Sequence, residues 1–194
     1  MTLFWAKLIW FLGVAGWFII RYPHDRRSRR TPTVQRGRRL HDMALLTISF
    51  TGMFVLPAIY VLTGEPKFAD TPFHPILAWL GVATFAAALW LFRRTHKELG
   101  RNWSVTLEIR DRHVLVTNGV YRRIRHPMYA AFWLWALAQA LLLPNWIAGP
   151  AGLVGFGTLF FLRVGREERL MEQAFGDEYR QYAAHTGRII PRIF

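Results

Sequence analysis

The stretch GVYRRIRHPMY, from Gly119 to Tyr129, runs directly into the apolar sequence AAFWLWALAQALLL of residues 130–143. Three arginines and a histidine therefore stand at the start of a segment whose composition is typical of a membrane-buried helix. Charged groups at a membrane interface are costly unless they are paired or serve a function. This stretch predicts a helical membrane protein with a polar site at the mouth of one of its helices.

The composition of the whole chain supports this prediction. Of the 194 residues, 53% are hydrophobic and 15% are aromatic, yet the formal net charge is +13. A basic nucleic-acid-binding protein normally spreads its charge over a polar surface, whereas here basic and apolar residues form separate blocks. We therefore expect membrane lipids, and no nucleic acid, as partners. The absence of cysteine excludes disulfides, thiolate metal sites and cysteine nucleophiles, and no metal site is expected.

Five apolar runs approach the roughly 20 residues that an α-helix needs to cross a bilayer core. They are Leu3–Ile20, Met43–Leu62, Ile76–Phe92, Met128–Ile147 and Gly149–Val164. The first run predicts a retained anchor, because its charges follow it and no small-residue cleavage site is evident. The last contains GLVGFG, which indicates close helix packing rather than a nucleotide loop, since no strand precedes it.

The arginines predict the orientation in the membrane. Segment 21–42 holds eight of them, and segment 93–127 and the C-terminal tail carry almost all other basic residues. The loop 63–75 contains only one lysine or arginine, Lys67. The positive-inside rule therefore places the N-terminus outside and the three basic segments in the cytoplasm, where they also meet anionic headgroups.

We expect one membrane domain over residues 1–194. Residues 1–92 would form three N-terminal spans with a basic cytoplasmic loop, and residues 93–194 a core with a helical hairpin. The tail REERLMEQAFGDEYRQYAAH has apolar residues at spacings of three and four, which predicts a C-terminal amphipathic interfacial helix. The predicted fold class is all-α, a polytopic integral membrane protein with about five transmembrane helices and a cytoplasmic loop for a ligand.

The loop between the third and fourth runs carries further signals. VTLEIRDRHVLVT, residues 105–117, has a short β-like alternation, and Thr117, Asn118 and Gly119 form a turn signal. A loop of this length within a compact protein is often functional. We therefore expect it to contribute to a site.

His126 lies immediately before Pro127, and this order predicts a helix that begins at the proline. The residue before a proline is driven out of the α region, and proline is tolerated in the first helical turn. Arg125 and His126 would thus lie at a helix N-terminus, where free N–H groups and the helix dipole favour an anion. Taken alone, the residues leave two interpretations open: they bind the phosphate groups of lipids, or they form a site for an anionic ligand.

Acidic residues follow at the end of the fifth run. Arg163 lies four residues before Glu167, so the two share one helix face, and Glu168 is adjacent. A hairpin formed by the fourth and fifth runs would bring this face close to Arg125 and His126. The convergence predicts either a salt-bridge network that fixes the hairpin or a functional site.

Four segments together resemble the isoprenylcysteine carboxyl methyltransferase family, which belongs to a wider group with membrane phospholipid methyltransferases. They are LGRNWS, HVLVTNGVYRRIRHPMY, REERLMEQAFGDEYRQY and the closing RIIP. The combination of RHPxY with a Glu-Glu pair and FGxEYxxY after a hairpin is specific, and the resemblance covers residues 99–191. Chain length and span number are similar to those of the smaller prokaryotic members, which would place the protein in the cell membrane. The first two runs carry no recognisable motif.

The resemblance implies an integral-membrane enzyme that uses S-adenosylmethionine from the cytoplasm. The implied cofactor pocket consists of His113, Val114, Leu115, Val116, Tyr121, Arg125, His126, Pro127, Met128 and Tyr129. The implied cofactor-contacting acid is Glu167 or its neighbour Glu168, and Arg163 corresponds to a residue placed to meet substrate, so Arg163 and Glu167 are the expected catalytic pair. Many members have glycine where this chain has Ala131, which predicts a slightly tighter pocket wall.

The acceptor stays open between two chemistries. A carboxylate needs no base but needs a cation to hold it, such as Arg163, whereas a protonated amine needs a base, for which Glu167, Glu168 or His126 could serve. Arg163 favours the carboxylate of an isoprenylcysteine-like or other lipophilic substrate; the alternative is a phospholipid headgroup amine. Two other classes of protein stay open as alternatives. One is the sterol reductases, which bind a nicotinamide cofactor and are typically larger, and the other is a basic membrane scaffold without enzymatic activity.

Overall fold

The computed structural model describes residues 1–28, 33–36, 39–100, 108–110 and 114–191. The chain folds into helices α1 (Leu3–Ser28), α2 (Arg39–Phe50), α3 (Leu56–Thr63), α4 (Pro75–Leu99), α5 (Pro127–Leu142), α6 (Ala151–Phe175) and α7 (Asp177–His185). A π-helical turn, η1 (Thr51–Val55), joins α2 to α3, and short 3-10 turns form at η2 (Lys67–Ala69) and η4 (Gly119–Arg122).

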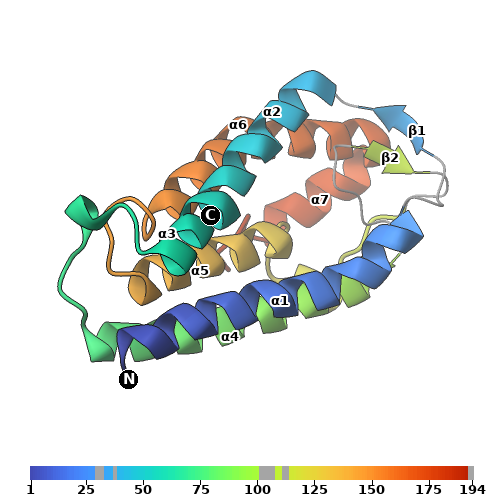
Figure 1. Cartoon of the computed structure of the whole chain (residues 1–194). Coiled ribbons are helices and arrows are strands. Elements are labelled where there is room, and N and C mark those ends of the chain that lie inside the picture. The colour runs from blue at the N-terminus through green and yellow to red at the C-terminus, as the bar shows by residue number, and fades with distance from the viewer. Residues whose placement is uncertain (29–32, 37–38, 101–107, 111–113, 192–194) are drawn as a thin grey trace.

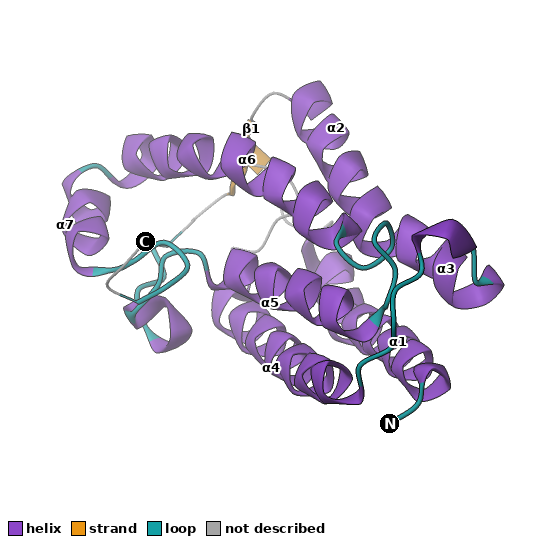
Figure 2. Ribbon diagram, turned by 90° about the vertical axis from the view of Figure 1, so that its left-hand side faces the viewer, coloured by secondary structure: helices purple, strands orange, loops and turns teal. Residues whose placement is uncertain are grey.

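The long helices run back and forth between the two ends of the molecule, left and right in Figure 1. Helix α4 packs along α5 and also against α1, whereas α2 packs along α6. The N-terminus and the loop 64–74 lie at one end, and the segments near β1, β2 and α7 lie at the other (Figure 1). In the second view, α2 and α6 form one side of the molecule, and α1, α4 and α5 form the other (Figure 2).

Three helices within the described part of the chain are long and apolar enough to cross a membrane, and they correspond to the first three predicted spans. They are Leu3–Arg26, Leu40–Thr63 and Pro75–Leu99. Helix α5 is apolar but has only 16 residues. It ends at Leu142, before the Ile147 predicted for the fourth span, because Pro144 cannot continue the helical hydrogen bonding.

A compact turn joins α5 to α6, as the predicted helical hairpin requires. Asn145 is buried, and its Oδ1 accepts hydrogen bonds from the N–H groups of Ile147 and Ala148 at 3.0 and 2.9 Å. Its Nδ2 donates to Asp70 Oδ1 at 2.9 Å. The hairpin turn is therefore tied to the loop before α4.

The glycines of α6 allow close packing against α2 and η1, which confirms the packing interpretation of GLVGFG. A Cβ at Gly155 would lie 2.8 Å from the carbonyl oxygen of Ile48, and one at Gly52 would lie 2.2 Å from that of Ala151. These distances are too short for any side chain, so glycine is required on both helices.

The C-terminal tail differs from the single interfacial helix that was predicted. The first half of REERLMEQAFGDEYRQYAAH continues α6 without a break to Phe175, and the second half forms α7. Gly176, with φ of +54°, ends α6, and its N–H donates to the carbonyl of Glu172. A composition change between apolar and charged residues does not interrupt a helix, whereas a glycine with positive φ does.

A small antiparallel sheet adds to the otherwise helical fold. Strand β1 (Thr33–Arg36) pairs with β2 (Glu108–Arg110). The β-like alternation predicted for residues 105–117 thus forms a strand at its centre, and its partner lies in the basic segment after α1. This pairing brings two of the three basic segments together at one end of the molecule (Figure 1).

Candidate active site

A cavity of about 650 Å³ lies between the two sides of the molecule. Its walls come from α1, α2, η1, α4, α5, α6 and α7 and from the segment 114–121. Cavities of this volume commonly bind cofactors and small molecules. Both halves of the chain therefore contribute to one cavity.

The cavity has an apolar floor of aromatic rings. Trp17, Phe54, Phe92, Phe132 and Phe156 line it. Phe54 lies 4.9 Å from Trp17 between ring centroids, and Phe92 lies 5.6 Å from Phe132. This part of the cavity suits a lipophilic group, because it offers apolar surface and few polar partners.

The opposite part of the cavity is polar. It is lined by Tyr121, Arg125, His126, Tyr129, Arg163, Glu167, Tyr179 and Tyr182. Tyr121 is buried at 7% exposure, and this burial raises the pKa of its phenol well above the usual value, so the hydroxyl stays neutral. Neutral tyrosines, a cation and a carboxylate thus surround one space.

Arg125 and His126 are held in place by the C-terminal tail. The N–H of Arg125 donates to the carbonyl of Gly187 and that of His126 to Arg188, both at 2.8 Å. Ile124 and Gly187 form a parallel bridge beside them. Pro127 then begins α5, as predicted, with His126 as the residue before its first turn. The backbone entering α5 is therefore fixed by strand-like pairing with residues 187–188.

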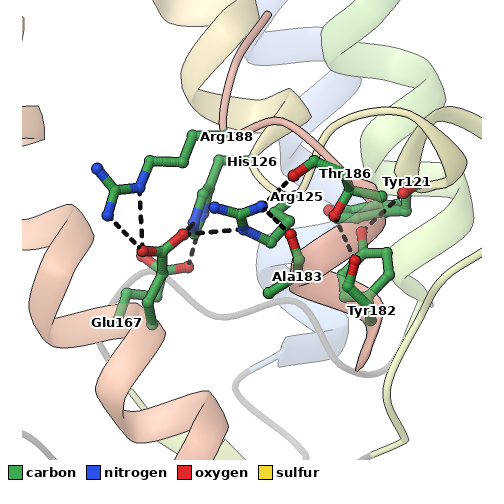
Figure 3. A network of polar contacts seen from close by, with 9 residues as sticks. Tyr121, Arg125, His126, Glu167, Tyr182, Ala183, Thr186 and Arg188 are labelled. Atoms are coloured by element: carbon green, nitrogen blue, oxygen red, sulfur yellow. Dashed lines mark hydrogen bonds and ion pairs between the residues drawn. The ribbon is translucent and has the colours of Figure 1, made fainter. Parts of the chain in front are cut away.

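Glu168 is the centre of an ion-pair network with Arg125, His126 and Arg188. Figure 3 shows these three partners close together. Its Oε1 accepts from Arg125 Nε at 2.9 Å and lies 3.4 Å from His126 Nε2, and its Oε2 accepts from Arg188 Nε at 3.0 Å. Partial burial opposes ionisation, but the hydrogen bonds from His126, Arg188 and Arg125 outweigh it and lower the pKa of Glu168 to about 2. Glu168 is therefore a carboxylate at neutral pH.

Arg125 also binds the end of α7. One of its terminal nitrogens donates to the carbonyl of Ala183 at 2.9 Å and to that of Thr186 (Figure 3). Tyr182 donates its phenolic hydrogen to the carbonyl of Tyr121 at 2.7 Å. These contacts dock α7 onto the segment that leads into α5.

Glu167 faces the cavity rather than this network. Its Oε2 accepts a hydrogen bond from the Tyr129 hydroxyl at 2.5 Å, and its Oε1 lies 3.9 Å from His126 Nδ1. The ring of His126 stacks on that of Tyr129 at 5.4 Å. The neighbouring glutamates thus have different surroundings: Glu168 contacts Arg125, His126 and Arg188, whereas Glu167 contacts Tyr129 and His126 and lines the cavity.

Arg163 lies one helical turn before Glu167 and lines the same cavity. Its side chain is 6% exposed. On the same wall, Leu159 and Phe156 lie further along α6 toward the apolar floor. Arg163 therefore stands on the helix between the acid and the apolar part.

Most of the predicted site residues come together in this cavity. Those that line it are Val114, Leu115, Val116, Tyr121, Arg125, His126, Met128, Tyr129, Arg163 and Glu167. Pro127 begins α5, and Glu168 lies in the ion-pair network; neither is among the lining residues. His113 lies outside the described residues. Ala131 is buried at 2% exposure in the helix core rather than in the cavity wall, so the expected tighter wall does not follow.

The sequence analysis missed the wall that α1, α2 and η1 supply. Trp17, Arg21, Phe50 and Phe54 line the cavity from this side, and so does His96 on α4, which is fully buried. Aromatic residues in apolar spans carry no motif, so no local signal distinguishes cavity-lining rings from lipid-facing ones. A histidine near the end of an apolar run was the one available hint.

Comparisons with known proteins agree on one family. The model of the isoprenylcysteine carboxyl methyltransferase family matches residues 79–173. The protein-S-isoprenylcysteine O-methyltransferase of Dictyostelium discoideum is 38% identical over 90 residues, which are 44% of this chain and 36% of that protein. Protein-S-isoprenylcysteine O-methyltransferase B of Arabidopsis thaliana is 35% identical over 96 residues, covering 48% of this chain and 49% of the relative.

A solved structure is also similar. The structure of the eukaryotic intramembrane Ras methyltransferase, isoprenylcysteine carboxyl methyltransferase, matches with a TM-score of 0.56 and 28% sequence identity, over 76% of this chain and 52% of that one. This chain spans less than half the length of the curated relatives it matches. The matched residues include α5, most of α6 and the RHPMY stretch at the start of α5. Residues 79–173 of this chain are thus similar to the isoprenylcysteine carboxyl methyltransferase family.

Proposed function

We propose that the protein is an S-adenosylmethionine-dependent methyltransferase that methylates a carboxylate on a lipophilic, isoprenylcysteine-like acceptor at the membrane. The observation that carries the proposal is the single cavity, which joins a polar part with a carboxylate and an arginine to an apolar floor of aromatic rings. The names of the relatives point to the same chemistry.

The polar part fits the cofactor. When bound, S-adenosylmethionine supplies an electrophilic methyl group on a sulfonium. The Glu167 carboxylate suits the ammonium of its amino-acid part, and the faces of Tyr121 and Tyr129 suit a cation. The apolar segment Val114–Val116 offers a wall for a flat adenine. Within the described part of the chain, Arg125 Nε binds Glu168 and one terminal nitrogen binds the carbonyls of Ala183 and Thr186. The other terminal nitrogen is the one that would meet the cofactor carboxylate.

Arg163 is the residue we assign to the acceptor. Arg163 lines the cavity between the Glu167 carboxylate and the apolar floor, where a guanidinium suits the carboxylate of an acceptor. A carboxylate acceptor is already nucleophilic and requires no general base, so the protein must hold it, align it and exclude water. Arg163 would hold the carboxylate while the lipophilic chain lies over the aromatic floor.

Helix α7 would exclude water from the polar part. Tyr179 and Tyr182 line the cavity from α7, and Arg125 and Tyr182 dock this helix. We further propose that this end faces the cytoplasm and that the N-terminus lies outside. The basic segments 21–42 and 93–127 reach this end of the molecule, and the loop with few basic residues lies at the opposite end (Figure 1).

The test is methyl transfer from S-adenosylmethionine with a labelled methyl group to N-acetyl-S-farnesyl-cysteine. A carboxyl methyl ester releases labelled methanol in mild base, whereas an N-methyl amine does not. We expect base-labile product from the wild type and strongly reduced kcat/KM for Arg163→Gln. Base-stable label in phosphatidylethanolamine, without label in the cysteine acceptor, would instead establish the headgroup amine as the substrate.

A further inference from the structure

The helix that begins with α2 contains a backbone defect at the floor of the cavity. In the π-helical turn η1, the N–H of Leu56 donates to the carbonyl of Thr51, five residues back. The next residue, Pro57, has no N–H. The carbonyl of Gly52 therefore lacks both helical donors, the one four residues on and the one five residues on.

A side chain from α5 supplies the missing donor. Gln139 is fully buried, and its Nε2 donates to the carbonyl of Gly52 at 3.1 Å. The same nitrogen lies 2.8 Å from the carbonyl of Ala148 and 3.3 Å from that of Gly149. One amide thus ties the π turn to the connection between α5 and α6. A buried carbonyl without a partner is costly, so this contact stabilises the π turn.

The π turn decides which side chains close the cavity. A π turn inserts one residue into the helix and so changes which side chains face the neighbouring helices. Met53, at 1% exposure, and Phe54 lie within the turn and line the cavity. The ring of Phe54 contacts Trp135 at 5.2 Å, and Trp135 belongs to the core below the floor. The position of Phe54 is therefore fixed from below by the core and along the chain by the turn.

We propose that Gln139 is a positioning residue for acceptor specificity: by holding the π turn, it fixes the aromatic floor and so the longest lipophilic chain that the cavity accepts. This inference rests on the proposed function. It assigns specificity to residues 51–57, outside the segment that matches the family. Acceptor chain length would then depend on the π turn of the N-terminal half together with Gln139 of α5, whereas the polar part of α5 and α6 would serve methyl transfer.

The test compares N-acetyl-S-geranyl-, S-farnesyl- and S-geranylgeranyl-cysteine as acceptors for the wild type and for Gln139→Leu. For the wild type, kcat/KM should be high for the acceptor whose chain just reaches the floor and lower for the acceptor with the next longer chain. Gln139→Leu should raise kcat/KM for the longer chain relative to the shorter by at least about tenfold, because a single methylene in an apolar pocket already changes discrimination by roughly 10–200-fold. The affinity for S-adenosylhomocysteine should stay unchanged, because the polar part is not touched.

A second change provides a rescue. Pro57→Ala restores a backbone N–H five residues after Gly52, in the pattern that Leu56 already follows with Thr51. In the Gln139→Leu background it should therefore return the chain-length ratio toward the wild-type value. A residue with only a general role in packing would not be rescued by one distant backbone N–H.

Two further variants keep the inference refutable. Phe54→Leu opens the floor directly and should shift the ratio in the same direction even if Gln139→Leu fails to fold. Trp90→Leu, on the exposed face of α4, should leave the ratio unchanged. Wild-type ratios in both Gln139→Leu and Phe54→Leu, with S-adenosylhomocysteine still bound, would overturn the inference. A wild type that binds S-adenosylhomocysteine but methylates none of the three acceptors would overturn the proposed acceptor and this inference with it.

Discussion

Replacing Glu168 by glutamine would remove the one carboxylate that Arg125, His126 and Arg188 share. The side chain is 15% exposed, so solvent screens these contacts only in part. A pKa of about 2, against an ordinary value of 4.5, corresponds to about 3 kcal/mol of stabilisation of the folded state at neutral pH. The same range is typical when one partner of a buried ion pair is removed.

We therefore expect Glu168→Gln to lower the free energy of unfolding by about 3 kcal/mol, measured by urea unfolding in detergent with tryptophan fluorescence. The pH dependence has a defined sign. Because the folded pKa of Glu168 lies below the unfolded value, its contribution is complete above pH 4.5 and is lost as the pH falls through about 2. The variant should not show this loss.

Glu172→Gln provides the matched control on the same helix. Glu172 pairs with Arg180 at the surface, where its side chain is 46% exposed, and its removal should change stability little. Equal stabilities of the Glu168 and Glu172 variants would refute the assigned role of the network. So would a wild type whose extra stability over Glu168→Gln persists at pH 2.

Three further changes test the packing of the site. Gly155→Ala should destabilise the protein by about 1–3 kcal/mol or prevent folding, because its Cβ would lie 2.8 Å from the carbonyl oxygen of Ile48. Thermal unfolding measures this loss, and a stability equal to that of the wild type would contradict the packing. Asp42→Asn should lower the free energy of unfolding in urea by about 3 kcal/mol, since Asp42 is 1% exposed and pairs with Arg166 at 3.1 Å. Asp42→Glu should recover part of this loss, and an unchanged stability of Asp42→Asn would refute the pairing. Tyr182→Phe should cost about 1 kcal/mol and increase amide hydrogen exchange in α7, whereas unchanged exchange would show that other contacts dock this helix.

The local parts of the site could be predicted because local signals determine them. Pro127 begins α5, so the position of His126 before it follows from the backbone rules for proline. Arg163 and Glu167 share a face because they are four residues apart in a helix. A tight hairpin then brings Glu167 and Glu168 near His126, at 3.9 and 3.4 Å.

The remaining parts depend on contacts between distant segments, which leave no local pattern. The pairing of Arg125 and His126 with residues 187–188 joins segments more than fifty residues apart. At the π turn, Pro57 lacks an N–H and Gln139 donates to the carbonyl of Gly52 instead, and neither residue alone predicts the other. The division of roles between Glu167 and Glu168 was likewise left open by the sequence, because it depends on which cations reach each carboxylate.

The most direct test of the central claim is calorimetric binding of S-adenosylhomocysteine to the detergent-purified protein. We expect micromolar binding by the wild type, at least a tenfold loss of affinity in Glu167→Gln, as expected for a charge-assisted contact, and no change in Glu172→Gln, which removes a glutamate of the same helix outside the cavity. Absence of binding by the wild type, or binding of NADPH in its place, would contradict the assignment of the cavity. Equal affinities of the wild type and Glu167→Gln would contradict the role given to Glu167.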